Sequence, residues 1–206
     1  MMKTPERDQP NKFFEAAYGN SAPWDIGRPQ PDLTGLLDEF EPLSPILDVG
    51  SGTGVLTLWL AEKGFSAIGV DSSEVAIKQA QEKLAQADAS IKQLVEFRTG
   101  DALHLTHIPE PVKSVVDSGF FHLFGPDERG EFASELARKL PSGGRYYLLG
   151  FAFQSPMPNA PRQVTAGELK QLFSPEQGWK ILVLRQAQFV TVRGDLPAIA
   201  GCFERA

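Results

Sequence analysis

The sequence predicts one α/β domain in which helices cover both faces of a mostly parallel sheet. The first observation is an alternation, from residue 45 onwards, of short apolar runs with segments whose apolar residues recur at helical spacing. The second is the end of the chain, where residues 180–184 and 198–203 are strand-like and have no helical segment between them. We expect these two runs to form an antiparallel pair joined by a turn at residues 194–197.

Five predicted strands precede this pair. Their ranges are 46–49, 66–70, 94–97, 114–117 and 146–153. The helix after the first strand is expected to end at Gly64, and Ser72 or Ser73 can cap the helix after the second strand. A further helix is expected from about Asp127 to the turn of residues 141–144.

Residues 1–42 differ in character from the rest of the chain. Proline interrupts them at Pro5, Pro10, Pro23, Pro29, Pro31 and Pro42. Aromatic surface comes from Phe13, Phe14, Tyr18 and Trp24. Because such a segment cannot build a core of its own, we expect a lid of short helices and turns over a main domain of residues 43–206.

Length and composition narrow the functional classes. The chain has 206 residues and a net charge of −6, with no cluster of Lys and Arg, so a nucleic-acid substrate is not expected. No stretch approaches the roughly 20 apolar residues of a membrane span. The lone Cys202 and a charged, polar start without a signal-peptide core suit a cytoplasmic protein. The three histidines lack ligand spacing, so no metal site is expected, and the oligomeric state is left open.

The strongest motif is Ile-Leu-Asp-Val-Gly-Ser-Gly-Thr-Gly at residues 46–54. Gly50, Gly52 and Gly54 lie between the first strand and the first helix, where a tight turn and the close approach of a ligand both require residues without a Cβ. The N-terminus of the following helix offers free N–H groups to an anion. Enzymes that use nicotinamide cofactors share this glycine pattern, so it does not identify the ligand alone.

Two aspartates favour a different nucleoside ligand. Asp48 lies two residues before Gly50, where it can receive an ammonium group but would repel a pyrophosphate. Asp71 ends the second strand about 20 residues past the glycines, where its carboxylate can accept the ribose hydroxyls. A charge at the N-terminus of the next helix is the structural alternative for Asp71.

With these motifs in order, residues 46–151 resemble the class I S-adenosylmethionine (SAM)-dependent methyltransferases. The resemblance implies a Rossmann-like sandwich with strand order 3-2-1-4-5-7-6 and an antiparallel last strand. It also implies that Asp101 and Ala102 contact the adenine. The cofactor residues expected on this basis are Trp24, Asp48, Gly50, Ser51, Gly52, Gly54, Asp71, Ser72, Asp101, Ala102 and Asp117.

The end of the fourth strand is where this superfamily places residues on the substrate side. Open parallel sheets bind ligands at the carboxyl ends of their strands. The expected substrate residues are Phe120, Phe121, His122 and Tyr147. His122 is the candidate general base, with a hydrogen-bonded structural histidine as the alternative, and Asp117 is the second catalytic candidate, with a role in positioning the substrate or lid. Either Phe120 or Phe121 is expected to be core, because neighbouring residues on a strand point oppositely.

A narrower resemblance lies in Pro-Trp-Asp-Ile-Gly-Arg-Pro-Gln-Pro at residues 23–31. It is similar to the lid of thiopurine, thiol and halide methyltransferases, which implies that Trp24 packs near the cofactor while Asp25 and Arg28 fix the turn. The predicted function is methyl transfer from SAM, with S-adenosylhomocysteine (SAH) as product. The expected acceptor is a small molecule carrying a thiol, another chalcogen, a halide, an amine or a carboxyl group. The alternatives are a non-catalytic SAM-binding protein and an NAD-dependent oxidoreductase.

Overall fold

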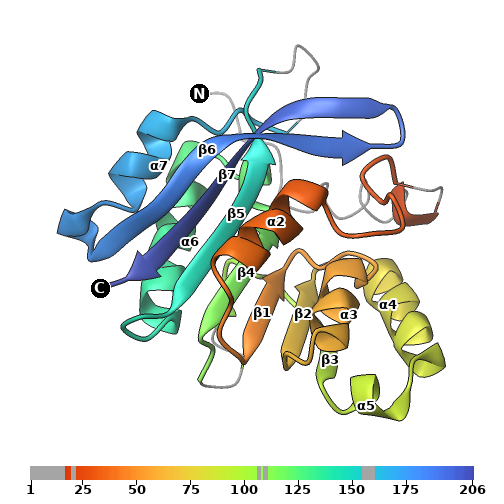
Figure 1. Ribbon diagram of the computed structural model, residues 1–206. Coiled ribbons are helices and arrows are strands. Elements are labelled where there is room, and N and C mark those ends of the chain that lie inside the picture. The colour runs from red at the N-terminus through yellow and green to blue at the C-terminus, as the bar shows by residue number, and fades with distance from the viewer. Residues whose placement is uncertain (1–16, 20–21, 106–107, 109–110, 155–160) are drawn as a thin grey trace, which may run out of the picture.

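The computed structural model describes residues 17–19, 22–105, 108, 111–154 and 161–206. Its seven strands form one sheet in the order β3-β2-β1-β4-β5-β7-β6 (Figure 1). They are β1 Ile46–Val49, β2 Ala67–Asp71, β3 Val95–Thr99, β4 Ser114–Ser118, β5 Arg145–Phe151, β6 Trp179–Thr191 and β7 Gly194–Arg205. The first five strands are parallel and β7 is antiparallel to both its neighbours, which confirms the predicted fold class and strand order.

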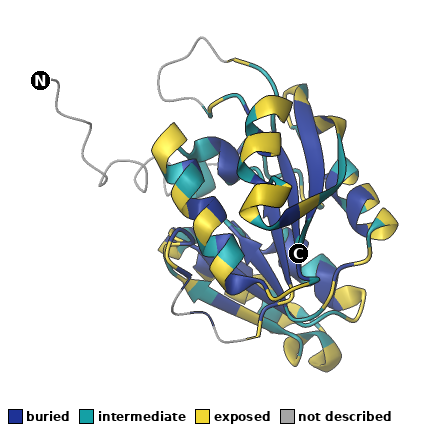
Figure 2. Cartoon of the chain, turned by 90° about the vertical axis from the view of Figure 1, so that its left-hand side faces the viewer, coloured by how far each residue is buried: buried dark blue, intermediate teal, exposed yellow. Residues whose placement is uncertain are grey.

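Helices cover both faces of this sheet. Helices α2 (Pro31–Glu39), α3 (Val55–Glu62) and α4 (Glu74–Gln86) pack on one face, and α6 (Pro126–Lys139) and α7 (Ala166–Leu172) pack on the other. Short elements complete the chain: α5 (Ala89–Lys92), η2 (Phe121–Leu123) and η3 (Pro175–Gln177). Figure 2 shows the buried strands between helices whose outer sides are exposed. Both predicted helix ends are confirmed: Gly64 follows α3 with a φ of 89°, and Ser73 caps α4 by accepting the N–H of Ala76 at 3.2 Å.

The core consists of two main clusters, one on each face of the sheet. Neighbouring strand residues enter different clusters because side chains alternate across a strand: Leu47 and Tyr146 pack under α6 and α7, whereas Ile46 and Tyr147 pack under α2 and α3. Leu60 of α3 is fully buried in the second cluster. Burying one such side chain contributes about 1.5–3 kcal/mol, so the two clusters fix the helices against the sheet that carries the glycine turn.

The β6–β7 hairpin is longer than expected and reaches past the end of β5 (Figure 1). Its turn lies at Val192 and Arg193, so the predicted turn at residues 194–197 is wrong. Pro197, which the sequence places in the turn, lies within β7 opposite Gln188. Its carbonyl accepts the N–H of Ala152 at 2.9 Å, just beyond the end of β5. The N–H that proline lacks would point to the same side, where β5 has ended and no ladder hydrogen bond is needed.

The N-terminal segment is fastened to this hairpin. The Gln30 side chain is buried and pairs with both backbone groups of Val190, accepting its N–H at 2.7 Å and donating to its carbonyl at 2.9 Å. The backbone N–H of Val192 donates to the carbonyl of Pro23 at 3.0 Å. Helix α2 then buries Leu33, Leu36 and Leu37 and so belongs to the helix layer. The division of the chain at residue 42 stays a prediction.

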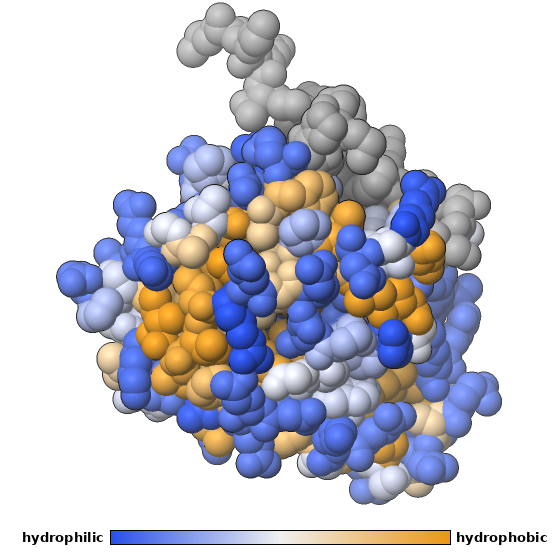
Figure 3. Space-filling model, turned by 45° about the horizontal axis from the view of Figure 1, so that its top comes forward, coloured by the Kyte–Doolittle hydropathy of each residue, from blue (hydrophilic) through white to orange (hydrophobic). Residues whose placement is uncertain are grey.

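The surface mixes apolar and hydrophilic side chains. On the face shown in Figure 3, hydrophobic residues gather in patches divided by hydrophilic ones. The edge strand β6 carries a run of partly exposed aliphatic residues, 181–184. Ile181 and Leu184 pack against one core cluster, and Leu182 and Val183 pack against the other. Among the residues that the structure describes, no helix is long and apolar enough to cross a membrane.

Candidate functional site

The glycine turn between β1 and α3 can be built only without side chains. Gly50, Gly52 and Gly54 have φ values of 65°, 53° and 79°, in the left-handed region that glycine adopts without strain. A Cβ on Gly50 would lie 2.7 Å from the Phe120 ring, and one on Gly52 would lie 2.8 Å from the Tyr18 hydroxyl. The turn therefore lets other groups approach its backbone more closely than any other residue type would permit.

Hydrogen-bond donors gather at this turn. Gly54 is the N-cap residue of α3, so the first N–H groups of that helix lie beside the turn. The backbone N–H of Ser51 is bonded to the carbonyl of Val70 at 3.0 Å, which ties the turn to β2. The Ser51 hydroxyl is buried and has no hydrogen-bond partner among the described residues. An unpaired buried hydroxyl next to a helix N-terminus suits an anionic group such as a carboxylate.

Asp71 at the end of β2 is held rigidly beside the turn. Its Oδ2 accepts the backbone N–H of Gly52 at 2.9 Å, and its Oδ1 accepts that of Ser73 at 2.9 Å. Burial raises the pKa of this carboxyl, while the backbone hydrogen bonds oppose the rise. Each oxygen keeps a further lone pair, so Asp71 can accept hydroxyl groups from a ligand.

Asp48 lies at the third position of β1 and points toward α3. Its carboxylate accepts the hydroxyl proton of Thr57 at 2.6 Å. Burial raises its pKa to about 7, the hydrogen bond from Thr57 opposes this, and the charges of Asp117 and Asp71 raise the pKa further. Buried carboxyls on neighbouring strands thus create a local environment that favours a cationic ligand.

Asp117 at the end of β4 is engaged with the protein itself. Its oxygens accept the backbone N–H groups of Phe120 at 2.7 Å and Phe121 at 3.0 Å, and the hydroxyl of Tyr146 at 2.9 Å. Burial raises its pKa to about 7, against the effect of these hydrogen bonds. The carboxyl group therefore fixes the turn that leads into η2, and its catalytic role stays a prediction.

The two phenylalanines of this turn point in different directions. Phe120 is half-buried, and its ring lies against Gly50. Phe121 is fully buried in the core, tilted against Phe132 with the rings 6.3 Å apart, and the Arg129 guanidinium lies 4.9 Å from its ring centre. Only Phe120 lies at the glycine turn.

His122 is buried and already hydrogen-bonded. Its Nδ1 accepts the backbone N–H of Phe151 at 3.3 Å, and its ring stacks on the Phe151 ring at 4.2 Å. Burial lowers its pKa to about 3, and the charge of Arg129 adds to this. The imidazole is therefore neutral, and because Nδ1 accepts, its proton is on Nε2. To act as a base His122 would first have to give up the bond from Phe151, so that role stays a prediction.

Aromatic rings gather around His122 at the carboxyl ends of the strands. Phe151, at the end of β5, lies 5.0 Å from Phe189 of the β6–β7 hairpin and 5.3 Å from Phe153. The His122 and Phe189 rings are 6.1 Å apart. Phe151 and Phe153 are only partly buried. We call Phe151, Phe153, Phe189 and His122 the aromatic cluster.

Tyr18 of the N-terminal segment lies over the glycine turn, and Trp24 lies against Tyr18. The Trp24 indole N–H donates to the Tyr18 hydroxyl at 3.4 Å, and the two rings meet edge to face at 5.9 Å. Burial raises the pKa of Tyr18, and the charge of Asp71 raises it further, so the phenol keeps its proton. Trp24 was among the predicted site residues. Tyr18 was not, although it belongs to the aromatic set of the predicted lid.

The remaining predicted residues are spread more widely. Ser72 is exposed beside Asp71. Asp101 is exposed after β3 and accepts the N–H of Leu103 at 2.9 Å, while Ala102 is buried. Tyr147 is fully buried under α2, third in a strand whose carboxyl end is Phe151, so the structure does not bring it to the glycine turn.

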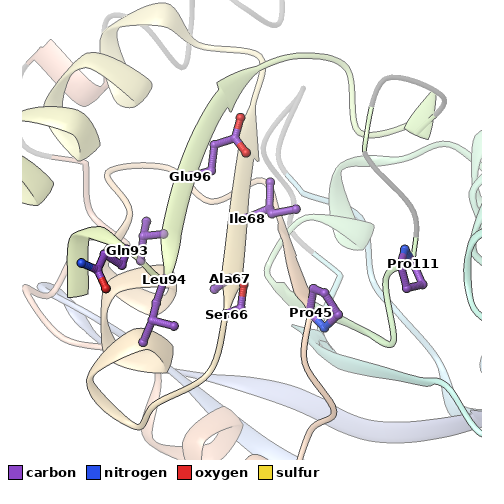
Figure 4. A pocket seen from close by; sticks show the side chains of 9 residues that line it. Pro45, Ser66, Ala67, Ile68, Gln93, Leu94, Glu96 and Pro111 are labelled. Atoms are coloured by element: carbon purple, nitrogen blue, oxygen red, sulfur yellow. The ribbon is translucent and has the colours of Figure 1, made fainter. Parts of the chain in front are cut away.

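A hollow of about 450 Å³ lies at the opposite end of the sheet (Figure 4). Its lining includes the first residues of β2 and β3 and residues just before β1, β2 and β3, which are amino ends. The lining residues are Pro45, Ser66, Ala67, Ile68, Gln93, Leu94, Val95, Glu96 and Pro111. This hollow is separate from the glycine turn, which follows the carboxyl end of β1.

The glycine turn, the adjoining helix N-terminus and the acidic strand ends define the class: an α/β domain built to bind a nucleoside-containing cofactor. A family model described as "Methyltransferase domain" matches residues 46–144. The 2-heptyl-1-hydroxyquinolin-4(1H)-one methyltransferase of Mycobacteroides abscessus is 29% identical over 172 residues, which cover 79% of this chain and 74% of that protein. An uncharacterized methyltransferase of Geobacillus sp. is 32% identical, over 54% of this chain and 49% of its own length.

Solved structures agree with these relatives. A structure from work on the conversion of a disulfide bond into a thioacetal group during echinomycin biosynthesis has a TM-score of 0.79 and 28% identity, covering 95% of this chain and 92% of that one. A SAM-dependent methyltransferase from Anabaena variabilis, 20% identical, shares the fold with a TM-score of 0.76 over 100% of this chain and 98% of that one.

The matched methyltransferase model, these relatives and the solved structures together support a class I SAM-dependent methyltransferase. The chain is thus an enzyme, and its cofactor is SAM. The residues at the turn fit this group, because the unpaired Ser51 hydroxyl and the N-terminus of α3 match its carboxylate, and the buried carboxyls match its positive charges. The thiopurine-like subgroup stays a prediction.

Proposed function

We propose that the glycine turn holds the methionine part of SAM. In this proposal Asp48 receives the ammonium group, and the turn backbone with the Ser51 hydroxyl binds the carboxylate. Asp71 and Ser72 bind the ribose, Asp101 and Ala102 contact the adenine, and Trp24 covers the cofactor. The support is the position of Asp48 and Asp71 on either side of a turn that a side chain would fill.

We further propose that the acceptor is a small aromatic molecule. The observation that carries this proposal is the aromatic cluster, which lies at the carboxyl ends of β5 and near the tip of the β6–β7 hairpin. Flat rings bind well between aromatic side chains, which supply large apolar area and favour offset or edge-to-face contact. Phe120 would complete the wall on the side of the glycine turn.

A relative supports this acceptor class. The Mycobacteroides abscessus protein, 29% identical, is named for methylation of 2-heptyl-1-hydroxyquinolin-4(1H)-one, which contains an aromatic ring system. The acceptor groups expected from the sequence are a thiol, another chalcogen, a halide, an amine or a carboxyl group. We add to them a hydroxyl on a heteroaromatic ring, as in the acceptor for which the relative is named.

Methyl transfer from SAM requires the protein mainly to align the acceptor with the methyl group. Bound SAM supplies a methyl group already activated by its positive sulfur. Because positive charge on sulfur disappears in the transition state, aromatic side chains that attract a cation only weakly suit this position. Trp24 and Phe120 would supply such surface, exclude water and align the acceptor for in-line displacement.

We propose that no side chain of the described site removes a proton from the acceptor. The supporting geometry is that of His122, whose Nδ1 is occupied by the Phe151 N–H, and of Asp117, whose carboxyl is occupied by three donors. The acceptor then reacts as a nucleophile that is soft, or that is already deprotonated at the working pH. In this arrangement Asp117 positions Phe120, and His122 shapes the aromatic wall.

The test is turnover of methyl-labelled SAM with a panel of acceptors. The panel contains an N-hydroxyquinolone, an aryl thiol, an aliphatic thiol, iodide and an aliphatic amine. The proposal predicts methylated product from an aromatic member, and a several-fold higher KM for that acceptor in Phe151→Ala and Phe153→Ala, with the Kd for SAH unchanged. An exchange at the exposed Val192, Val192→Ala, serves as the control for changes on the hairpin.

Turnover of only iodide or the aliphatic members would contradict the aromatic acceptor. SAH binding without turnover of any acceptor would match the non-catalytic alternative, which the methyltransferase relatives do not favour. The panel would then be widened to carboxyl acceptors. The oxidoreductase alternative is not supported, since the family is that of methyltransferases. We also propose, from the net charge of −6 and the single buried cysteine, a cytoplasmic enzyme that does not act on nucleic acid.

A further inference from the structure

The N-terminal segment is tied to the glycine turn through one buried hydroxyl. Thr53, in the turn, donates its hydroxyl proton to Asp25 Oδ2 at 2.8 Å. The Thr53 hydroxyl oxygen in turn accepts a hydrogen bond from Lys83 Nζ at 2.6 Å, and Lys83 also donates to the carbonyl of Thr53 at 3.1 Å. Thr53 is 6% exposed, so three parts of the chain meet at a hydroxyl shielded from water.

Helix α4 holds the segment at a second point. Gln79 donates its amide N–H to the carbonyl of Tyr18 at 3.1 Å. Because Gln79 and Lys83 are four residues apart, they lie on one face of α4. That face therefore holds the chain at Tyr18 directly and at Asp25 through Thr53.

Between these two points lie the side chains that cover the turn. The Tyr18 hydroxyl would be 2.8 Å from a Cβ on Gly52, and Trp24 donates to that hydroxyl. A molecule bound along Gly52 would take the space that the Tyr18 hydroxyl occupies, so binding there requires this cover to move. Moving it far enough separates Asp25 from Thr53.

We propose that Asp25, Thr53 and Lys83 form a latch that holds the segment carrying Tyr18 and Trp24 closed over the glycine turn, and so sets how fast SAM and SAH leave the enzyme. All three are positioning residues, because they act through the cover. Hydrogen bonds that involve a charged group are stronger than neutral ones, and both bonds of the Thr53 hydroxyl are of this kind.

The test measures the dissociation rate constant of SAH from the full chain by surface plasmon resonance. Thr53→Val keeps the side-chain shape and removes the hydroxyl, whereas Thr53→Ser keeps the hydroxyl. We expect Thr53→Val, Asp25→Asn and Lys83→Met each to raise the rate constant roughly fivefold to thirtyfold. Thr53→Ser is expected to stay close to the unaltered protein.

Matched controls separate the latch from general charge effects. Lys78→Met lies on the same helix and Asp38→Asn on α2, and both positions are exposed. Neither is expected to change the rate constant. In a double-mutant cycle, Asp25→Asn and Lys83→Met together are expected to raise it less than the product of their separate effects, because both act on one hydroxyl.

Two further readouts distinguish a latch from a general structural role. The melting temperature without SAH is expected to change little in Asp25→Asn and Lys83→Met, while hydrogen exchange at the Asp25 N–H, bonded to the carbonyl of Ala22 at 3.0 Å, becomes faster. Asp25 and Lys83 lie nearer the surface than Thr53. If Thr53→Val does not fold, the SAH dissociation rates of the Asp25 and Lys83 variants therefore test the latch. Unchanged SAH dissociation in Asp25→Asn and Lys83→Met would overturn the proposal.

Discussion

Gly52 donates its backbone N–H to Asp71 at 2.9 Å, so the glycine turn after β1 and the end of β2 are fixed to each other before any ligand binds. The carboxylate can make this bond only because both groups lie at the carboxyl ends of adjacent parallel strands. Because the site is pre-formed, a ligand loses less binding free energy to ordering the protein. Asp71 also keeps lone pairs that can accept hydrogen bonds from the ligand.

The first prediction concerns this pair. Asp71→Ala removes the bond to Gly52 and the proposed acceptor for the ribose hydroxyls. SAM binding is expected to weaken by roughly 1–3 kcal/mol for lost charged hydrogen bonds. Calorimetry with SAM measures this, with Asp38→Ala as the exposed control. An unchanged affinity would refute the ribose assignment.

The second prediction concerns the cover of the turn. Trp24→Ala is expected to impair SAM binding or turnover and to leave the melting temperature nearly unchanged, because Trp24 is only partly buried and packs at the edge of a core cluster and against Tyr18. Thermal unfolding followed beside turnover checks this. If the variant unfolds instead, Trp24 is a structural anchor and the proposed contact with the cofactor loses its support.

The third prediction follows from the buried carboxyl of Asp48. Its pKa lies near 3.8 when exposed and at about 7 in the fold, so between these values the folded protein binds a proton that the unfolded chain does not. Stability from this group is therefore present below about pH 4 and is lost as the pH rises to about 7. Relative to Asp48→Asn, the SAM-free protein is expected to lose about 1–3 kcal/mol between pH 5 and 8. Urea unfolding of both proteins at each pH checks the sign, and a gain with rising pH would contradict it.

The fourth prediction concerns His122. Because its pKa is lowered to about 3 and its Nδ1 accepts a hydrogen bond, kcat/KM for the acceptor at saturating SAM is not expected to follow titration of the His122 imidazole. The pH profile should instead move with the pKa of the acceptor when acceptors of different acidity are compared. A profile with a fixed midpoint near 6.5 that disappears in His122→Gln would show that His122 is a base after all.

Much of the fold is readable from the sequence, and particular elements show why. Residues 46–49 and 114–117 are buried without interruption because central parallel strands are covered on both faces, and the apolar residues among them mark these strands in the sequence. The bounds of the β6–β7 hairpin are predicted less accurately. Strand β6 runs from Trp179 to Thr191, but Arg185 and Gln186 are exposed in its middle, so the apolar run of residues 180–184 marks only its first part.

The site divides in the same way. The glycines, Asp48 and Asp71 are found from local sequence, since one turn and two strand ends position them. Tyr18, Thr53 and Lys83 were missed, because their contacts join residues about 30 or more positions apart and leave no local pattern. Likewise, only the structure shows that Nδ1 of His122 is occupied by Phe151, 29 residues away.

The central claim is that the turn of residues 50–54 holds the methionine part of the cofactor. A crystal structure of the protein grown with SAH tests it most directly. The account predicts amino-acid density along Gly50 and Gly52, with its ammonium group toward Asp48 and the ribose hydroxyls on Asp71. SAH bound elsewhere, with the Tyr18 hydroxyl still against Gly52, would contradict it.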